Sequence, residues 1–339
     1  MDKFKKVAVT ALGGALAAST ANAVDVSVSG GSEIGWGTGS GNYAANKASA
    51  FGAGTGVSFS ASGDLDNGWT VSTTHATSNA FALTSSNITV DTGSMGKVRF
   101  NRVGAAATNA NDDVLPTAWE EANDNADTSI RGTALADNMS SGSISYISPT
   151  IDLAGGSVSF TLDYDPAASS GGGNPGATIA RTANTGNGVA YGTSVTMGPL
   201  TAHAGYAVTE STKTDTGGAQ GNDGKNIMVQ VIADLGAVSI GAGEWEMNGK
   251  DGATDYSTQG LGISFNVNDD LSVSWGELED TKEADSATAA VATEVTSIQV
   301  AYSMGSMAVK AKRVETDNPY NQTALNSTEH TELSVSFTF

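Results

Sequence analysis

The chain has 339 residues, of which 36 are acidic and 16 are lysine or arginine, and its formal net charge is −20 at pH 7. Such an acidic surface repels phosphate backbones and excludes nucleic acid as a partner. The absence of cysteine excludes disulfides and thiolate metal sites. Glycine is frequent, with 42 residues, and proline is rare, with 6, which favours short strands and turns over helices.

The first residues have the pattern of an export signal. Three lysines precede an apolar, small-residue stretch and an A-x-A cleavage site at Ala21-Asn22-Ala23. We therefore expect residues 1–23 to be a removed signal peptide and residues 24–339 to form one domain. The signal carries three lysines and one aspartate, a net charge of +2, so its removal changes −20 to −22. No later run approaches the roughly 18 apolar residues that a transmembrane helix needs.

From Val24 onward, apolar and polar residues alternate in segments of about ten residues, the length of a tilted strand that crosses a bilayer. Alternation gives each strand one apolar and one polar face. Met228 and Ile232 interrupt this alternation, because both are apolar and would point into a polar lumen. The sixteen segments have their apolar positions within Val24–Val28, Val57–Ala61, Trp69–Val71, Ile88–Val90, Val98–Phe100, Ile144–Tyr146, Val158–Leu162, Val189–Met197, Leu200–Tyr206, Val229–Leu235, Val238–Ile240, Leu261–Val267, Leu271–Trp275, Ile298–Met304, Val309–Ala311 and Leu333–Phe339.

The connections between these segments alternate between short and long. Short ones are rich in turn residues, as at Gly63–Gly68 and Gly93–Gly96, and the longest loop covers residues 103–141. With an even strand count both ends lie on the short-turn side, where the first and last strands can pair. The pattern predicts an all-β fold, a sixteen-stranded antiparallel transmembrane β-barrel with an aqueous lumen. Alternation alone also fits a secreted β-sandwich array or a solenoid, but a sandwich does not require all long loops on one side, and no solenoid repeat recurs.

Four segments carry a resemblance to a known family: Val24–Gly30, the turn Gly63–Gly68, the hairpin Gly93–Phe100 and the terminal Phe339. With these the chain resembles the Gram-negative porins, particularly the sixteen-stranded porins of alphaproteobacteria. The resemblance spans the mature chain and implies an outer-membrane channel for passive diffusion of small hydrophilic solutes and ions. It also implies a homotrimer in outer-membrane lipid, no cofactor, and Phe339 as the signal for the outer-membrane assembly machinery.

In that family the third long loop folds into the lumen as a constriction, and the run from Asp112 to Glu121 is similar to that loop. If its carboxylates hang into the pore, they raise the local cation concentration, so we expect a cation preference. A solvated acidic loop or an adventitious Ca²⁺ site are the other interpretations. The expected constriction residues are Asp112, Asp113, Glu120, Glu121, Asp124 and Asp127.

Basic residues of the strands are expected on the lumen wall, opposite the acidic loop. Each alternates with apolar neighbours, and a lysine or arginine facing lipid at the midplane would cost roughly 2 to 4 kcal/mol. The upper aromatic girdle is expected to include Trp36, Tyr164 and Trp245. The expected basic wall residues are Lys97, Arg99, Lys310 and Lys312.

An enzyme is not indicated by the sequence. The three histidines are His75, His203 and His330, and His203 alternates with Ala202 and Ala204 so as to face the lumen. No positioned serine and carboxylate accompany it, and no zinc-type spacing or phosphate-binding loop occurs. A surface structural or adhesion protein that uses the barrel as an anchor is the alternative function, although no loop exceeds about forty residues, which is short for a binding domain.

Overall fold

A computed structural model describes residues 24–40, 49–126, 130, 133, 135–136, 139, 141–168, 185–211, 223–249, 254–283, 291–323, 325 and 327–339. The expected signal peptide, residues 1–23, lies outside the described residues. Within the part described, no helix is long and apolar enough to span a bilayer.

Seventeen strands form one continuous antiparallel sheet. Two of them, β6 and β7, both pair with β8 and are separated only by Ser148, Pro149 and Thr150, so they are the two halves of one wall strand. The wall therefore has the sixteen strands that alternation predicted. The strands are β1 Val24–Ser40, β2 Ala50–Asp64, β3 Thr70–Thr77, β4 Leu83–Asp91, β5 Lys97–Val103, β6 Ile144–Ile147, β7 Ile151–Leu153, β8 Gly156–Asp165, β9 Thr185–Met197, β10 Leu200–Ser211, β11 Gly224–Asp234, β12 Val238–Asn248, β13 Tyr256–Asn266, β14 Leu271–Lys282, β15 Ala292–Met304, β16 Met307–Asp317 and β17 Thr328–Thr338.

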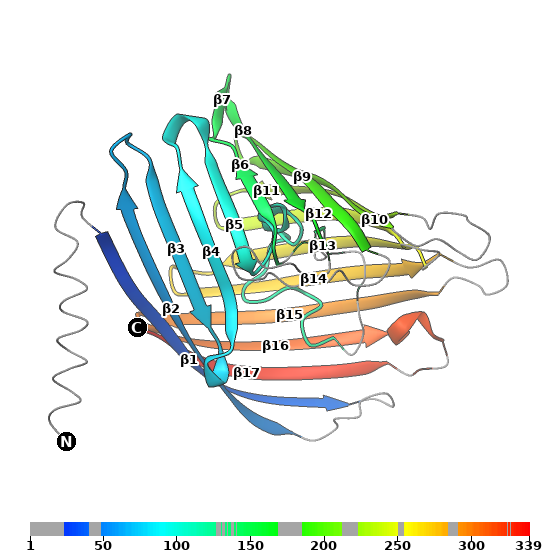
Figure 1. Cartoon of the computed structure of the whole chain (residues 1–339). Helices are drawn as coiled ribbons and strands as arrows, with labels where there is room; N and C mark the ends of the chain where they lie inside the picture. The colour runs from blue at the N-terminus through cyan, green and yellow to red at the C-terminus, as the bar shows by residue number, and fades with distance from the viewer. Residues whose placement is uncertain are drawn as a thin grey trace, which may run out of the picture.

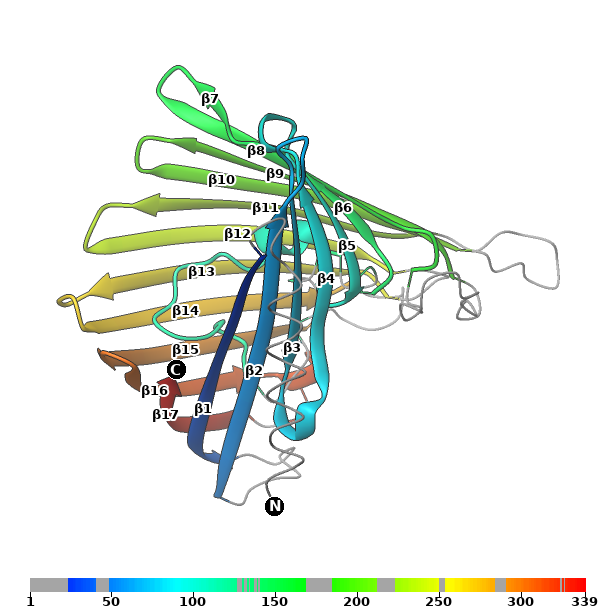
Figure 2. The ribbon, with the colours of Figure 1, turned by 60° about the vertical axis from the view of Figure 1, so that its left-hand side comes forward.

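Pairing of the first strand with the last closes the sheet. Residues Gly31–Ser40 of β1 pair with Glu329–Thr338 of β17, while the same strand pairs with β2 on its other side. Closure leaves no long unpaired edge in the lipid, where each unpaired backbone group would cost several kcal/mol. In Figure 1 and Figure 2 the strands β2–β5 cross the strands β13–β16 at a steep angle, because strands tilted about a barrel axis slope in opposite directions on opposite walls.

The two faces of each strand differ in size and polarity. The outward face carries exposed apolar side chains, such as Val26, Phe59, Ile88, Val229 and Ile298, and this is the face that meets lipid. The inward positions that alternate with them are mainly serine, threonine, asparagine, glutamine and glycine. The apolar residues are therefore on the outside of the sheet and the polar ones inside, the reverse of a water-soluble sandwich.

The strands are longer than the alternating segments from which they were predicted. β1 has 17 residues and continues beyond Ile34, where its inward positions are glycines. These glycines extend the hydrogen-bonded ladder but have no polar side chain that the alternation could reveal.

The third long loop was expected to fold into the lumen, and this loop carries the candidate site. In Figure 1 the chain that follows β5 lies between the two walls rather than outside them.

Candidate pore constriction

The connection between β5 and β6, residues 104–143, is named here the constriction loop. It begins with the 3-10 helix η3, Ala107–Asn111, which packs against the inner wall. The carboxylate of Asp163 on β8 accepts hydrogen bonds from the backbone N–H of Ala107 (3.0 Å) and Thr108 (2.8 Å) and from the hydroxyl of Ser145. This fully buried carboxylate fixes the direction in which the loop enters the lumen.

The end of η3 is held by a second polar cluster. Ser194 Oγ on β9 donates to Asn111 Oδ1 at 2.7 Å, and His203 Nδ1 on β10 lies 2.8 Å from Ser194 Oγ and 3.1 Å from Asn111 Oδ1. The serine proton is thus directed at an amide oxygen, away from the imidazole. These three side chains fasten the loop and do not form an activated nucleophile.

Two wall glutamines bind the loop backbone with both ends of their amides. Gln230 on β11 accepts from Val114 N (3.3 Å) and donates to Asn111 O (2.7 Å). Gln299 on β15 accepts from Trp119 N (2.9 Å) and Glu120 N (3.0 Å), and its Nε2 donates to Glu120 O (2.7 Å). Each glutamine side chain thus provides the loop backbone with hydrogen-bond partners that a neighbouring strand would provide in a sheet.

The position of Trp245 differs from the sequence prediction. Instead of joining an outer aromatic girdle, it faces the lumen, is 1% exposed, and its Nε1 donates to Asp112 O at 2.7 Å. Alternation placed the tryptophan near the upper strand end, but it could not show that the constriction loop covers the inner face there. Met228, which interrupted the alternation, is likewise buried beneath the loop.

Glycines on the inner wall make room for the loop, a feature that the sequence analysis missed. A Cβ on Gly241 would lie 2.5 Å from Pro116 Cδ, and one on Gly262 would lie 2.9 Å from Pro116 O. The repeated G-x-G of β12 and β13 was the available signal, because glycine inside a strand often marks the close approach of another backbone. The inner-wall glycines whose added Cβ would contact the loop closer than 3.0 Å are Gly188, Gly192, Gly205, Gly241, Gly260, Gly262 and Gly276.

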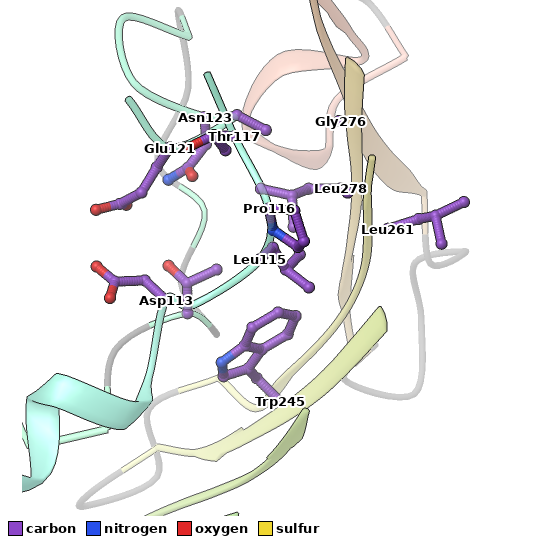
Figure 3. Close-up of a pocket in the computed structure, with 13 residues that line it drawn as sticks. Asp113, Leu115, Pro116, Thr117, Glu121, Asn123, Trp245, Leu261, Gly276 and Leu278 are labelled. Carbon is purple, nitrogen blue, oxygen red and sulfur yellow. The ribbon is translucent and has the colours of Figure 1, made fainter. Parts of the chain in front are cut away.

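The acidic residues of the loop divide by environment. Asp112 is buried and its Oδ2 accepts from Leu135 N at 2.9 Å, so it shapes the loop. Asp113 is exposed, and the carboxylates of Asp113 and Glu121 point to the same side, away from the strands behind Leu115 (Figure 3). Burial, followed by the hydrogen bond and negative charge of Asp113, raises the pKa of Glu121 to about 8. Glu121 therefore holds its proton more tightly than a carboxyl group in water does.

The last acidic residues contact the basic strand β16. Glu120 forms an ion pair with Lys312, whose side chain is completely buried and whose Nζ also lies 4.0 Å from Glu332 on β17. The Lys312 and Lys310 ammonium groups lie 5.2 and 5.3 Å from the centre of the Trp119 ring.

Asp124, further along the loop, is half-buried. Burial raises its pKa, and the charge of Lys312 partly opposes this rise.

The basic residues were expected on the wall across the pore from the acidic loop, and the structure places them in other surroundings. Lys310 and Lys312 lie beneath the acidic loop rather than across the pore from it. Lys97 pairs with Asp91 at 3.1 Å, at the start of β5 and directly after the short turn Gly93–Gly96. Arg99 faces inward and its Nη2 donates to Ala105 O at 3.2 Å, next to the start of the loop.

Asp127, also expected in the constriction, lies outside the described residues. Among the residues that are described, no group of three or more histidine, aspartate or glutamate side chains is arranged to hold a metal ion. A cavity of about 30 Å³, large enough for a water molecule, separates the loop from the wall near Asp113, Leu115 and Trp245.

Comparisons with known proteins agree with this geometry. The family model of Gram-negative porins matches residues 8–339. The chain belongs to the Gram-negative porin family. A search of curated proteins gave no significant match.

Solved structures share the fold at low sequence identity. OmpF of Salmonella typhi in complex with daunomycin is 10% identical, with a TM-score of 0.68 over 93% of this chain and 97% of its own. The outer-membrane channel DcaP of Acinetobacter baumannii is 11% identical, with a TM-score of 0.65 over 93% and 97%. The trimer form of Vibrio cholerae OmpT is 12% identical, with a TM-score of 0.65 over 94% and 100%.

Family and architecture together define the role of this porin. It is an outer-membrane protein whose closed barrel forms a water-filled channel for passive diffusion of small hydrophilic solutes and ions. Hydrogen bonds join the constriction loop to side chains of β8, β11, β14, β15 and β17. In Figure 2 it lies inside the barrel against the strands β13–β16.

Proposed function

We propose that this porin is a cation-preferring homotrimer without catalytic activity, and that the preference arises at the constriction loop. The observation that carries the proposal is the orientation of Asp113 and Glu121, whose carboxylates point away from the strands behind Leu115 (Figure 3). In a channel with low-dielectric walls, the charge of Asp113 concentrates cations and repels anions, and Glu121 adds to this effect once it is deprotonated.

The other charged side chains of the inner wall also favour a preference for cations. The lumen-facing cations Lys97 and Lys312 each form an ion pair, and Arg99 lies close enough to Asp163 to feel its charge. Further carboxylates such as Glu33 on β1 face the lumen as well, where Glu33 accepts from Ser334 of β17. The inner surface of the described barrel is thus more acidic than basic.

Two observations support the other parts of the proposal. The Vibrio cholerae OmpT structure is described as a trimer, and this chain has the same fold, so a homotrimer is the assembly we propose. The absence of catalytic activity is supported by the hydrogen bonds at the inward-facing His203. Ser194 donates its proton to Asn111, so the histidine does not activate the serine as a nucleophile.

The cation preference is tested by the reversal potential of single channels in a planar bilayer across a KCl gradient. We expect a potential of the sign for K⁺ preference, and a several-fold smaller K⁺ to Cl⁻ permeability ratio in the triple variant Asp113→Asn, Glu121→Gln, Asp124→Asn. Asp66→Asn, which removes an exposed carboxylate in the turn after β2, is the control and is expected to leave the ratio unchanged. Anion selectivity of the native channel would contradict the proposal.

A further inference from the structure

A row of neutral polar side chains crosses the inner wall from β1 to β5, where it reaches the two ends of the constriction loop. The register pairs Ser27 with Ser60, Ser60 with Thr74, Thr74 with Asn87, and Asn87 with Asn101, on β1 to β5 in turn. Directly paired residues point to the same face of a sheet. Ser60 Oγ and Thr74 Oγ1 lie 3.3 Å apart. This set of five residues is named here the polar row.

The polar row climbs obliquely around the barrel wall. Neighbouring strands are about 4.8 Å apart, so five strands place its members along roughly 19 Å. Because strands in a barrel are tilted by about 40°, a row perpendicular to them climbs along the barrel axis as it turns. A hydroxylated solute that moves along the wall therefore meets one hydrogen-bonding partner after another.

At the β5 end the row reaches a cavity of about 440 Å³ between the wall and η3. This volume is in the range of small-molecule binding sites. Asn87, Asn101, Arg99 and Thr161 are among the residues that line it. Two buried atoms of this lining, Arg99 Nε and Thr161 Oγ1, have no hydrogen-bond partner among the described residues. Buried polar atoms in proteins are rarely left in this state, so the cavity offers donors for a polar ligand.

Charge in the cavity is close to balanced, which bears on the ligand. The Arg99 guanidinium interacts with the buried carboxylate of Asp163 on β8, across the intervening β6. The inner faces of β1 to β4, in their described residues, contain no lysine or arginine. The other polar side chains of the lining are amides and hydroxyls, and alanines of the loop and Ile147 complete the lining. Such a set binds hydroxyl groups, which both donate and accept, better than it binds an anion.

We propose that this cavity, together with the polar row that leads to it, is a binding subsite for polyhydroxylated solutes, sugars and linear polyols, in the channel. The inference rests on the channel function and names a class of solute for it. Arg99 Nε and Thr161 Oγ1 supply the unused hydrogen-bonding groups, and Asn87 supplies an amide at the mouth of the cavity. Binding here retains the solute between the wall and η3, at the start of the constriction loop.

The test is a titration of the K⁺ current of single channels with D-glucose and D-mannitol. A bound solute obstructs the pore, so we expect the conductance of the native channel to fall with saturation, beyond the proportional loss caused by the lower conductivity of the solution. In the double variant Asn87→Leu, Thr161→Val we expect a half-saturating concentration about tenfold higher, because two hydrogen bonds to neutral groups are lost. Thr73→Val, one residue from the row and on the outward face, is the matched control and is expected to match the native channel.

The outcomes separate this subsite from the channel function. Conductance that follows the bulk conductivity of the sugar solution in the native protein overturns the subsite and leaves the channel intact. Equal half-saturation in the native channel and the double variant also overturns it. Failure of the native protein to conduct at all contradicts the channel function instead. If the double variant does not fold, judged by heat-modifiable migration, Asn87→Ala replaces it.

Discussion

Gln299 and Glu120, 179 residues apart in the sequence, are joined by two hydrogen bonds between one side-chain amide and one residue's backbone. Glu120 N donates to Gln299 Oε1 at 3.0 Å, and Gln299 Nε2 donates to Glu120 O at 2.7 Å. The ion pair between Glu120 and Lys312 lies at the same point of the loop. The position of the constriction is therefore set by the wall and not by the loop alone.

Replacing this amide with an apolar side chain of similar size, Gln299→Leu, is predicted to loosen the constriction loop. It leaves the N–H groups of Trp119 and Glu120 and one carbonyl without partners, at a cost of roughly 2 to 3 kcal/mol in local docking free energy. We expect more open-channel current noise in bilayer recordings and faster proteolysis of the loop. Gln259→Leu, at an exposed outward position of β13, is the control, and equal noise in the two variants would show that the amide does not hold the loop.

The inner-wall glycines give a second prediction. In Gly262→Ala the new Cβ would lie 2.9 Å from Pro116 O and 3.2 Å from Leu115 Cβ, so the loop must move toward the pore axis. Overpacking of this kind costs about 1 to 3 kcal/mol. We expect a lower single-channel conductance. Gly52→Ala, where a Cβ meets no atom within 4 Å, is expected to conduct as the native channel does, and a similar loss in both would refute the packing argument.

The role predicted for Phe339 as an assembly signal can be separated from its structural role. Its backbone exchanges two hydrogen bonds with Gly30, at 2.7 and 2.9 Å, while its side chain is 76% exposed. Phe339→Ala keeps the backbone pairing. We therefore expect less protein in the outer membrane of cells, measured by blotting of membrane fractions, but an unchanged melting temperature after refolding in detergent. Normal membrane levels would remove the assembly role.

The wall of the barrel could be predicted from the sequence, because lipid requires an apolar residue at every second position and this leaves a periodic pattern. The break of one wall strand at Pro149 and the inward position of Trp245 could not. A tryptophan near a strand end suits an outer girdle as well as a contact with a loop. Gln230 and Gln299 were missed for a related reason: polar inward residues are expected throughout a wet lumen, and their partners lie more than 100 residues away.

The carboxyl pair in the constriction gives a pH dependence with a defined sign. Because the pKa of Glu121 is raised to about 8, this group is mostly neutral at pH 7 and becomes negative as the pH rises through about 8. Cation preference is therefore expected to increase between about pH 7 and about pH 9. Reversal potentials in a KCl gradient, recorded across this range, measure it.

Two variants test whether Glu121 and Asp113 cause this increase in cation preference. Glu121→Gln removes the group that titrates, so we expect it to abolish the increase. Asp113→Asn removes the hydrogen bond and the negative charge that help to raise the pKa of Glu121, so we expect the increase to move to lower pH while persisting. A step that survives unchanged in Glu121→Gln would assign the titration to another group. A step that stays in place in Asp113→Asn would mean that burial, without Asp113, raises the pKa of Glu121.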